Sequence, residues 1–212
     1  MKLYNYFRSS ASFRVRIALA LKGLPYEYVS VHLARGEHLQ PAMAQTLPDR
    51  LVPHLQIDGH DLNQSMAIIE YLDETHPEPA LLPRDALGRA RVRALAQTVA
   101  CEIHPLNNLR VLKYLAQPLG IAEPDRNTWY RHWVRLGLET LEQQLQSLPS
   151  GRYCYGDSPT LADCCLVPQI FNARRFDTPL DGLPRTLAAF EACMALPAFI
   201  AAEPSACPDF EA

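Results

Sequence analysis

The sequence has no long hydrophobic run and little net charge, and these absences exclude several classes of protein. Its 212 residues contain no stretch near the roughly 18 apolar residues that a membrane-spanning helix needs. The first ten residues hold no apolar stretch of the roughly 7–15 residues found in a secretory signal. A formal charge of −3 creates no basic field that would attract a nucleic acid. We therefore expect a cytoplasmic protein that binds neither a membrane nor a nucleic acid.

Cysteine motifs and lysine are also scarce. The six cysteines form no Cys-x-x-Cys pair and have no histidines around them at zinc-binding spacing, so we expect reduced thiols and no metal site. Only three of the 20 basic residues are lysines. A genome rich in arginine codons explains most of this imbalance, although particular arginines remain candidates for binding anions. Hydrophobic residues make up 48% of the chain, as is typical of a globular protein.

The hydrophobic pattern of the first 80 residues predicts a small domain of alternating strands and helices. Alternating and β-branched runs predict strands, Gly23 and the Asp58-Gly59 turn separate elements, and apolar residues at helical spacing predict helices. The expected order is β-α-β-α-β-β-α, with strands near residues 2–6, 26–31, 54–57 and 61–63 and helices near 10–21, 39–47 and 64–76.

After residue 80 the pattern becomes helical throughout. Pro77 to Asp85 contains three prolines and is typical of a linker. Four segments with helical periodicity follow, at residues 87–117, 125–148, 160–176 and 183–196, and none of the intervening sequence resembles a strand. We therefore predict an α+β protein with domains at residues 1–80 and 86–212, the second domain being all-helical and ending in an irregular tail from Pro204.

Two predicted helix starts could bind an anion. Arg8-Ser9-Ser10-Ala11-Ser12 and Gln64-Ser65 each place hydroxyls and unpaired backbone N–H groups at the positive end of a helix. Capping of the helices also explains these serines without any ligand. Val52-Pro53 precedes a strand, and with a cis peptide bond Val52 could pair with an extended peptide. The pattern itself does not decide the isomer.

Several blocks of the sequence together resemble the zeta class of glutathione transferases, and the resemblance covers essentially the whole chain. These blocks are residues 6–19, Val52-Pro53, residues 64–72 and residues 108–112. The resemblance implies a thioredoxin-like domain with a cis-proline, a following all-α domain and a homodimer. It also implies a glutathione-dependent cis–trans isomerase that acts on a dicarboxylate keto acid, either maleylpyruvate or maleylacetoacetate.

The resemblance further implies which residues contact glutathione. Ser9 or Ser10 is expected to stabilise the glutathione thiolate. Ala11 stands where the class usually has cysteine, so the sulfur must come from glutathione, and His38 stands where glutamine is more usual. The implied contacts are Ser9, Ser10, Ala11, Ser12, Phe13, Arg14, His38, Val52, Gln64, Ser65, His104, Asn108, Leu109 and Arg110.

Three arginines are the candidates for binding the two carboxylates of such a substrate, because guanidinium is planar, bidentate and permanently charged. They are Arg8, which we also count as catalytic, Arg110 and Arg175. Position 110 varies within the class, and an arginine there favours the shorter dianion, maleylpyruvate. Arg174 is expected to be a solvated neighbour of Arg175.

Two other functions stay open at this point. The chain could be a general glutathione-conjugating or dehalogenating enzyme, or a non-catalytic protein of the glutathione transferase fold that binds ligands. Ala11 slightly favours the non-catalytic protein. The tetrapeptide Thr160-Leu161-Ala162-Asp163 matches a helix capping box, and we interpret it as structural.

Overall fold

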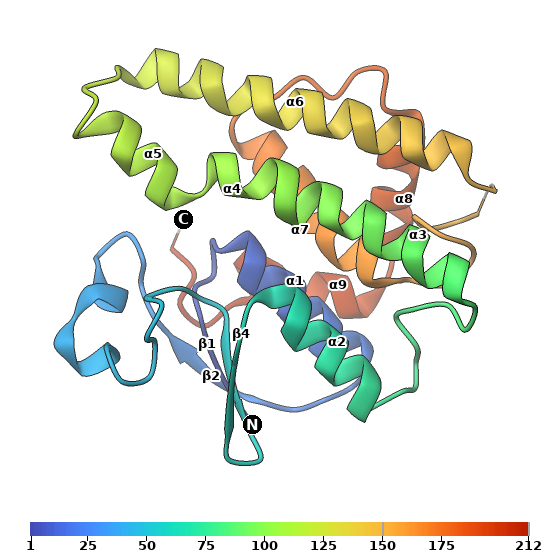
Figure 1. The fold of residues 1–212 in the computed structure, drawn as a ribbon, viewed down its shortest axis with the longest axis horizontal. Coiled ribbons are helices and arrows are strands. Elements are labelled where there is room, and N and C mark those ends of the chain that lie inside the picture. The colour runs from blue at the N-terminus through green and yellow to red at the C-terminus, as the bar shows by residue number, and fades with distance from the viewer. Residues whose placement is uncertain (150, 212) are drawn as a thin grey trace. The chain divides into compact units, whose positions relative to one another are not determined.

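The computed structural model describes residues 1–149 and 151–211, and the chain divides into two compact units. Unit 1 consists of Met1–Leu81 together with Met194–Ala212, and unit 2 consists of Leu82–Cys193. Figure 1 labels helices and strands of both units.

Unit 1 is built on a four-stranded mixed sheet in the order β2-β1-β3-β4. β1 pairs parallel with β2 and antiparallel with β3, so that Leu3 lies opposite both Tyr28 and Leu55. Helix α1 packs against α2 and α9. The bounds are β1 (Lys2–Asn5), α1 (Ser10–Leu21), β2 (Glu27–Ser30), β3 (His54–Ile57), β4 (His60–Asn63), α2 (Ser65–Thr75) and α9 (Pro197–Ala201).

The α+β fold class is confirmed, but one predicted helix of unit 1 is wrong. Residues 39–47 do not form a helix; the chain there makes two single turns of 3₁₀-helix, η1 (Glu37–Leu39) and η2 (Pro41–Met43). Gln40, the residue before Pro41, has an extended backbone (φ −67°, ψ 145°), because the proline ring disfavours the helical conformation of the residue before it. None of the residues of either turn is buried, so no apolar face draws the segment into a longer helix.

A buried arginine fixes the turn between β1 and α1. The side chain of Arg16 is 2% exposed and donates to Asn5 Oδ1 at 3.1 Å and to the carbonyls of Phe7 at 3.1 Å and Tyr6 at 3.4 Å. Its Nε–H also donates to the carbonyl of Ala202 at 3.0 Å. The guanidinium therefore holds the residues that precede α1 and joins them to the C-terminal part of the chain.

The C-terminal segment therefore groups with the sheet rather than with the helical unit. We expected the second domain to extend over residues 86–212, whereas Met194–Ala212 belongs to unit 1. The physical reasons are the packing of α9 against α1 and the hydrogen bond from Arg16 to Ala202. α9 lies beyond the last helix that periodicity predicts, at residues 183–196, and no local pattern shows that it packs against α1.

Lys22 connects the end of α1 to the chain that follows α2. Its Nζ donates to Asp73 Oδ1 at 2.9 Å and to the carbonyls of His76 at 2.6 Å and Pro79 at 2.9 Å. Asp73 Oδ1 in turn accepts the N–H of Leu81 at 2.8 Å. The predicted linker is thus ordered against unit 1 up to Leu81.

Unit 2 is helical, and its described residues include no strand. The helix predicted over 87–117 is interrupted, because Asn108 has an extended ψ of 163° and its Oδ1 caps the next helix by accepting the N–H of Val111 at 3.1 Å. The elements are α3 (Ala86–Gln97), the π-helical segment η3 (Thr98–Ile103), α4 (His104–Asn107), α5 (Leu109–Ala116), α6 (Glu123–Ser147), α7 (Leu161–Arg175) and α8 (Pro184–Met194).

The capping box predicted at Thr160–Asp163 is present at the start of α7. Asp163 is completely buried, and its carboxylate accepts the N–H of Thr160 at 2.7 Å, the hydroxyl of Thr160 at 2.8 Å and the N–H of Cys154 at 2.9 Å. Burial raises the pKa of Asp163, although these hydrogen bonds act in the opposite direction. All the partners belong to the structure itself, which supports our structural interpretation of this motif.

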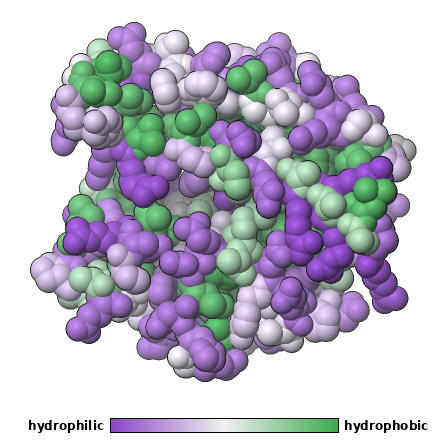
Figure 2. All heavy atoms as spheres, viewed as in Figure 1, coloured by the Kyte–Doolittle hydropathy of each residue, from purple (hydrophilic) through white to green (hydrophobic). Residues whose placement is uncertain are grey.

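Polar residues cover most of the face of the molecule shown in Figure 2, and the hydrophobic residues there form small separate groups. Within the described part of the chain, no helix is both long and apolar enough to cross a membrane.

Candidate functional site

The first turn of α1 places a capping hydroxyl at a helix N-terminus. Ser9 has extended backbone angles (φ −72°, ψ 114°) and its Oγ accepts the N–H of Ser12 at 3.2 Å. Its own N–H donates to the carbonyl of Tyr6 at 2.9 Å. A serine hydroxyl that accepts one hydrogen bond still carries a hydrogen to donate. Ser9 can therefore cap the helix and donate to an anion at the same time.

The residues after Ser9 differ in how far a ligand could reach them. Ser10 is 6% exposed, and Ser12, Phe13 and Arg14 are buried almost completely. Ala11 is half-buried. Of the two serines proposed for the thiolate, Ser9 is the more accessible and is also the helix cap, so capping does not remove it from consideration.

A buried hydrogen bond joins the N-termini of α1 and α2. Arg14 Nη1 donates to Ser65 Oγ at 3.2 Å, and Ser65 is the first residue of α2. Gln64 precedes it with a φ of 66°, which is uncommon for a residue other than glycine and is found where the surrounding structure enforces it. The side chain of Arg14, one turn into α1, thus reaches the first residue of α2, and both helix ends that the sequence predicts to bind an anion carry partial positive charge.

Two further predicted contacts of unit 1 lie outside these helix ends. The Val52–Pro53 peptide bond is cis, which answers the question that the sequence left open, and the side chain of Val52 is buried. His38 lies in η1 and is half-buried.

Arg8 is exposed and lies directly before Ser9. Its Nη2 donates to the backbone carbonyl of Glu211 at 3.1 Å, and its Cζ lies 5.0 Å from the centre of the Phe7 ring. The guanidinium is therefore held at the start of α1, and within residues 1–149 and 151–211 most of its five N–H donors remain for other acceptors.

The remaining predicted residues belong to unit 2 and are described within it. His104 begins α4, and Asn108 caps α5. Leu109 and Arg110 form the exposed first turn of α5. Because Asn108 breaks the chain direction here, Arg110 starts a new helix rather than continuing the one before it.

Arg175 and Arg174 end α7 and differ in their contacts. The Cζ of Arg175 lies 4.9 Å from the centre of the Phe176 ring, and its side chain is exposed. Arg174 stacks on Phe190 at 4.4 Å, and its Nη2 pairs with Glu191 at 3.3 Å. Arg174 thus has an exposed anionic partner, as expected for a solvated neighbour.

Comparison with known proteins places the chain in a family. Models of the N-terminal and C-terminal domains of glutathione S-transferase match residues 1–74 and 134–195. A maleylpyruvate isomerase from Ralstonia sp is 52% identical over 210 residues, which cover 99% of each chain. A solved holo structure of a maleylpyruvate isomerase, described as a bacterial glutathione S-transferase of the zeta class, has a TM-score of 0.98 at 51% identity and 100% coverage of both chains. The chain belongs to the zeta class of glutathione transferases.

A second solved member of this family carries a ligand. It is a maleylacetoacetate isomerase from Anaeromyxobacter dehalogenans with dicarboxyethyl glutathione and citrate bound in its active site. It is 45% identical to the present chain, with a TM-score of 0.88 and coverage of 100% of this chain and 97% of that one.

This zeta-class chain has no reactive thiol of its own in unit 1. Cys207 is the one cysteine in the sequence of that unit, and its Sγ donates to the carbonyl of Glu203 at 3.3 Å. Burial raises the pKa of Cys207, so its thiol stays protonated at neutral pH. In unit 2, burial likewise raises the pKa values of Cys154 and Cys193.

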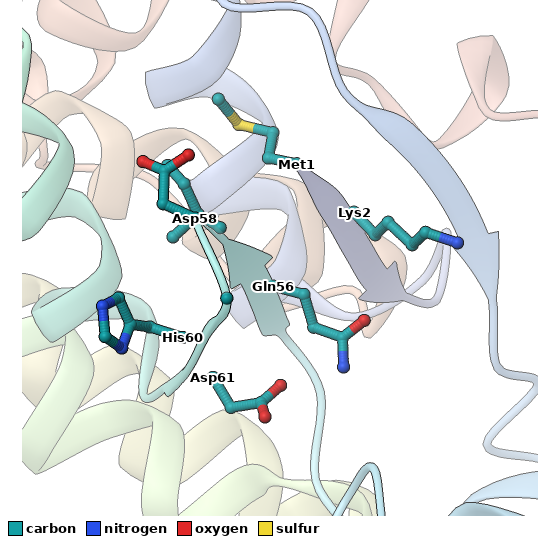
Figure 3. Close-up of a pocket in the computed structure, with 8 residues that line it drawn as sticks. Met1, Lys2, Gln56, Asp58, His60 and Asp61 are labelled. Atoms are coloured by element: carbon teal, nitrogen blue, oxygen red, sulfur yellow. The ribbon is translucent and has the colours of Figure 1, made fainter.

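A cavity of about 380 Å³ lies elsewhere in unit 1, at the β3–β4 hairpin (Figure 3). It contains none of the predicted site residues. Its charged side chains are of both signs and do not converge on one point in Figure 3. It is lined by Met1, Lys2, Gln56, Ile57, Asp58, Gly59, His60 and Asp61.

Sequence reasoning missed the C-terminal partner of Arg8. Glu211 lies in a short segment that contains prolines and has no periodicity, and no local pattern connects it with residue 8. The interaction spans almost the whole chain and becomes visible only in the structure.

We expect iodoacetamide at neutral pH to label Cys101 in the folded chain and to leave the other five thiols largely unmodified. Cys101 is exposed, whereas the other five cysteines are buried. Mass spectrometry of the intact chain and its peptides measures the result, and labelling in urea, which should reach all six thiols, is the control. Labelling of Cys207 as fast as Cys101 would contradict the absence of an activated thiol in unit 1.

Proposed function

We propose that this chain is a glutathione-dependent cis–trans isomerase that converts maleylpyruvate to fumarylpyruvate in the breakdown of aromatic rings. The observation that carries the proposal is the first turn of α1. There the capping hydroxyl of Ser9 and the exposed guanidinium of Arg8 adjoin each other, and Ala11 leaves the turn without a thiol. The zeta-class relatives named as isomerases of maleyl keto acids support the proposal.

The partial charges of unit 1 suit the binding of glutathione, which would supply the sulfur. Glutathione is an anionic peptide, and two helix N-termini joined through Arg14 and Ser65 offer partial positive charge to an anion. Gln64, whose positive φ is enforced by the surrounding structure, lies at the start of α2. We propose that one carboxylate of glutathione binds there. We propose that the binding residues are Ser9 through Arg14, His38, Val52, Gln64 and Ser65 in unit 1, with His104, Asn108, Leu109 and Arg110 contributed by unit 2.

Glutathione, when bound, supplies a thiolate that adds reversibly to the substrate double bond, so that the tripeptide is regenerated. The task of the first turn of α1 is to favour the ionised sulfur. A free thiol has a pKa of about 8.5 and is only slightly ionised at neutral pH. A helix N-terminus contributes roughly 0.3–2 kcal/mol, and a hydroxyl that donates to a charged group contributes roughly 1.5–3 kcal/mol. The hydroxyl of Ser9 is thus the larger contribution.

The arginines are proposed to bind the substrate. Maleylpyruvate carries a carboxylate at each end and a ketone whose oxygen gains negative charge when the double bond is attacked. We assign Arg8, Arg110 and Arg175 to these groups, because guanidinium donates two parallel hydrogen bonds and stays charged. We choose maleylpyruvate over maleylacetoacetate because of Arg110 on α5. An arginine at this position suits the shorter of the two dianions.

Three further properties complete the proposal. The thioredoxin-like domain at 1–80 binds glutathione, and the helical domain supplies much of the pocket for the keto acid. The chain works as a homodimer, as its resemblance to the class implies. It works in the cytoplasm, which is supported by its six free cysteines, because such thiols persist in a reducing compartment.

The decisive experiment follows the absorbance of maleylpyruvate while glutathione is kept far below the substrate concentration. We expect every substrate molecule to be isomerised, with many turnovers per glutathione and none without it. A conjugating transferase would stop after one equivalent of glutathione, and a ligand-binding protein would convert nothing. Either of these results, or equal turnover without glutathione, would reject the proposed function.

Replacing the capping hydroxyl should change the acidity of the bound thiol. We expect Ser9→Ala to raise the pKa of bound glutathione by about one to two units, because a charged hydrogen bond is lost. The ultraviolet absorbance of the thiolate as a function of pH measures this. Ser9→Thr, which keeps both the hydroxyl and the cap, is the control and should behave as wild type. A larger shift in Ser10→Ala than in Ser9→Ala would transfer the role to Ser10.

The arginine assignments predict losses in substrate binding. Arg8→Ala, Arg110→Ala and Arg175→Ala should each raise KM or lower kcat for maleylpyruvate, changing kcat/KM by about ten- to a hundredfold. Arg174→Ala is the matched control, because Arg174 adjoins Arg175 and pairs with Glu191 instead. Steady-state kinetics measure the effects. Wild-type kinetics in all three variants would refute the dianion-binding arginines.

A further inference from the structure

The C-terminal segment after α9 makes specific contacts with the start of unit 1. It continues through the 3₁₀ turn η4 (Pro204–Ala206) to Glu211, and it is the red end of the chain in Figure 1. Its partners lie on the β1–α1 turn, on β2 and on the loop after β2. The segment therefore connects three parts of unit 1 that are separate in the sequence.

Asp209 is the anchor of this segment. Its Oδ2 accepts the N–H of Phe7 at 3.3 Å and the hydroxyl of Ser30 at 2.9 Å, and its Oδ1 accepts the hydroxyl of Tyr28. Burial, followed by the hydrogen bond to Asp209, raises the pKa of Tyr28, so this hydroxyl stays a neutral donor. Three donors thus hold one carboxylate and attach the chain end to the turn that carries Arg8.

The residues after Asp209 reach Arg8 itself. The Phe210 ring packs edge-on against the Phe7 ring at 5.6 Å, and the guanidinium of Arg8 lies over that same Phe7 ring. The backbone carbonyl of Glu211 then accepts a hydrogen bond from Arg8 Nη2 at 3.1 Å. Arg8 is consequently held between an aromatic face and a carbonyl, both fixed by the C-terminal segment.

The chemistry of these contacts orients Arg8 without neutralising its charge. The acceptor is a neutral carbonyl, and among the described residues this one bond leaves four of the five N–H donors of the guanidinium for other groups. The carboxylate of Glu211 is engaged elsewhere, by Arg35 and by His32 Nε2 at 3.4 Å. The carboxylate of Asp209 is occupied by its own donors. The carboxylates of Asp209 and Glu211 are thereby held on partners other than Arg8.

We propose that the C-terminal segment, residues 207–211, is a positioning element that holds the guanidinium of Arg8 in the orientation in which it binds a substrate carboxylate. This inference rests on the proposed function, because it uses the role of Arg8 in binding the keto acid. Glu211 acts through its main-chain carbonyl, and Asp209 acts by fixing the segment. Neither residue contacts the substrate in this arrangement.

Two variants, each of which keeps both units, test the proposal. A chain that ends at Phe210 removes the carbonyl that holds Arg8, and Asp209→Asn weakens the anchor while keeping its shape. Each should raise KM for maleylpyruvate by about tenfold, with a smaller change in kcat, since one charged hydrogen bond no longer orients Arg8. The affinity for glutathione, measured by calorimetric titration, should stay within about twofold of wild type.

The decisive comparison repeats the truncation in an Arg8→Ala background. If the segment acts through Arg8, the truncation should change the KM of the Arg8→Ala variant by less than about twofold, because the effects of mutations at coupled sites are not additive. Ser205→Ala is the matched control in the adjoining turn η4, since Ser205 is exposed and its hydroxyl donates to Glu203 rather than to Arg8 or its neighbours. Thermal melting of each variant verifies that unit 1 stays folded.

The possible results separate this inference from the proposed function. An active wild type whose KM is unchanged or lowered by both variants would overturn the positioning role and leave the isomerase intact. An equal rise in KM with and without Arg8 would also overturn it, because the segment would then act on the fold alone. A wild-type chain without isomerase activity, or Arg8→Ala with wild-type KM, would overturn the role assigned to Arg8 and this inference together.

Discussion

The buried guanidinium of Arg16 is the constraint on which the site of unit 1 depends. Enclosing a positive charge is unfavourable unless hydrogen bonds replace the lost water, and Arg16 donates to Asn5 Oδ1 and to three backbone carbonyls. Those carbonyls belong to Tyr6, Phe7 and Ala202, so one side chain fixes the turn before α1 and the chain after α9. The positions of the groups that follow Phe7, and of the segment that contacts them, are set by the same interaction.

The electrostatics of unit 1 are organised so that positive charge stays available near the start of α1. Partial charges at two helix N-termini add to the full charge of Arg8. The acidic groups nearby are occupied: Asp209 accepts from neutral donors, and Glu211 pairs with Arg35 and His32. An incoming anion therefore meets donors that no carboxylate in the described part of the chain has already neutralised, which is what a site for acidic ligands requires.

The sequence predicts those parts of the fold that depend on local periodicity, and it fails where distant groups decide. The strands, α1, α2 and the helical character of unit 2 follow from the spacing of apolar residues. The helix expected at 39–47 is broken at Gln40, the extended residue before Pro41, and the helix expected at 87–117 is interrupted by a π-helical segment and by the cap at Asn108. The sequence does predict the candidate anion site at the helix ends, because serines are typical helix caps. The cis bond at Val52–Pro53 and the contact of Glu211 with Arg8 have no local signal.

The assignment of the chain's last residues to unit 1 has a consequence for biosynthesis. Unit 2 is continuous in the sequence, so all of its residues are translated before Ala202 and Asp209. Unit 1 needs both the beginning and the end of the chain, because Arg16 and Phe7 find acceptors in Ala202 and Asp209. The first segment to be translated is thus completed only after the whole of unit 2 has been synthesised, and until then Arg16 lacks the carbonyl of Ala202 as an acceptor.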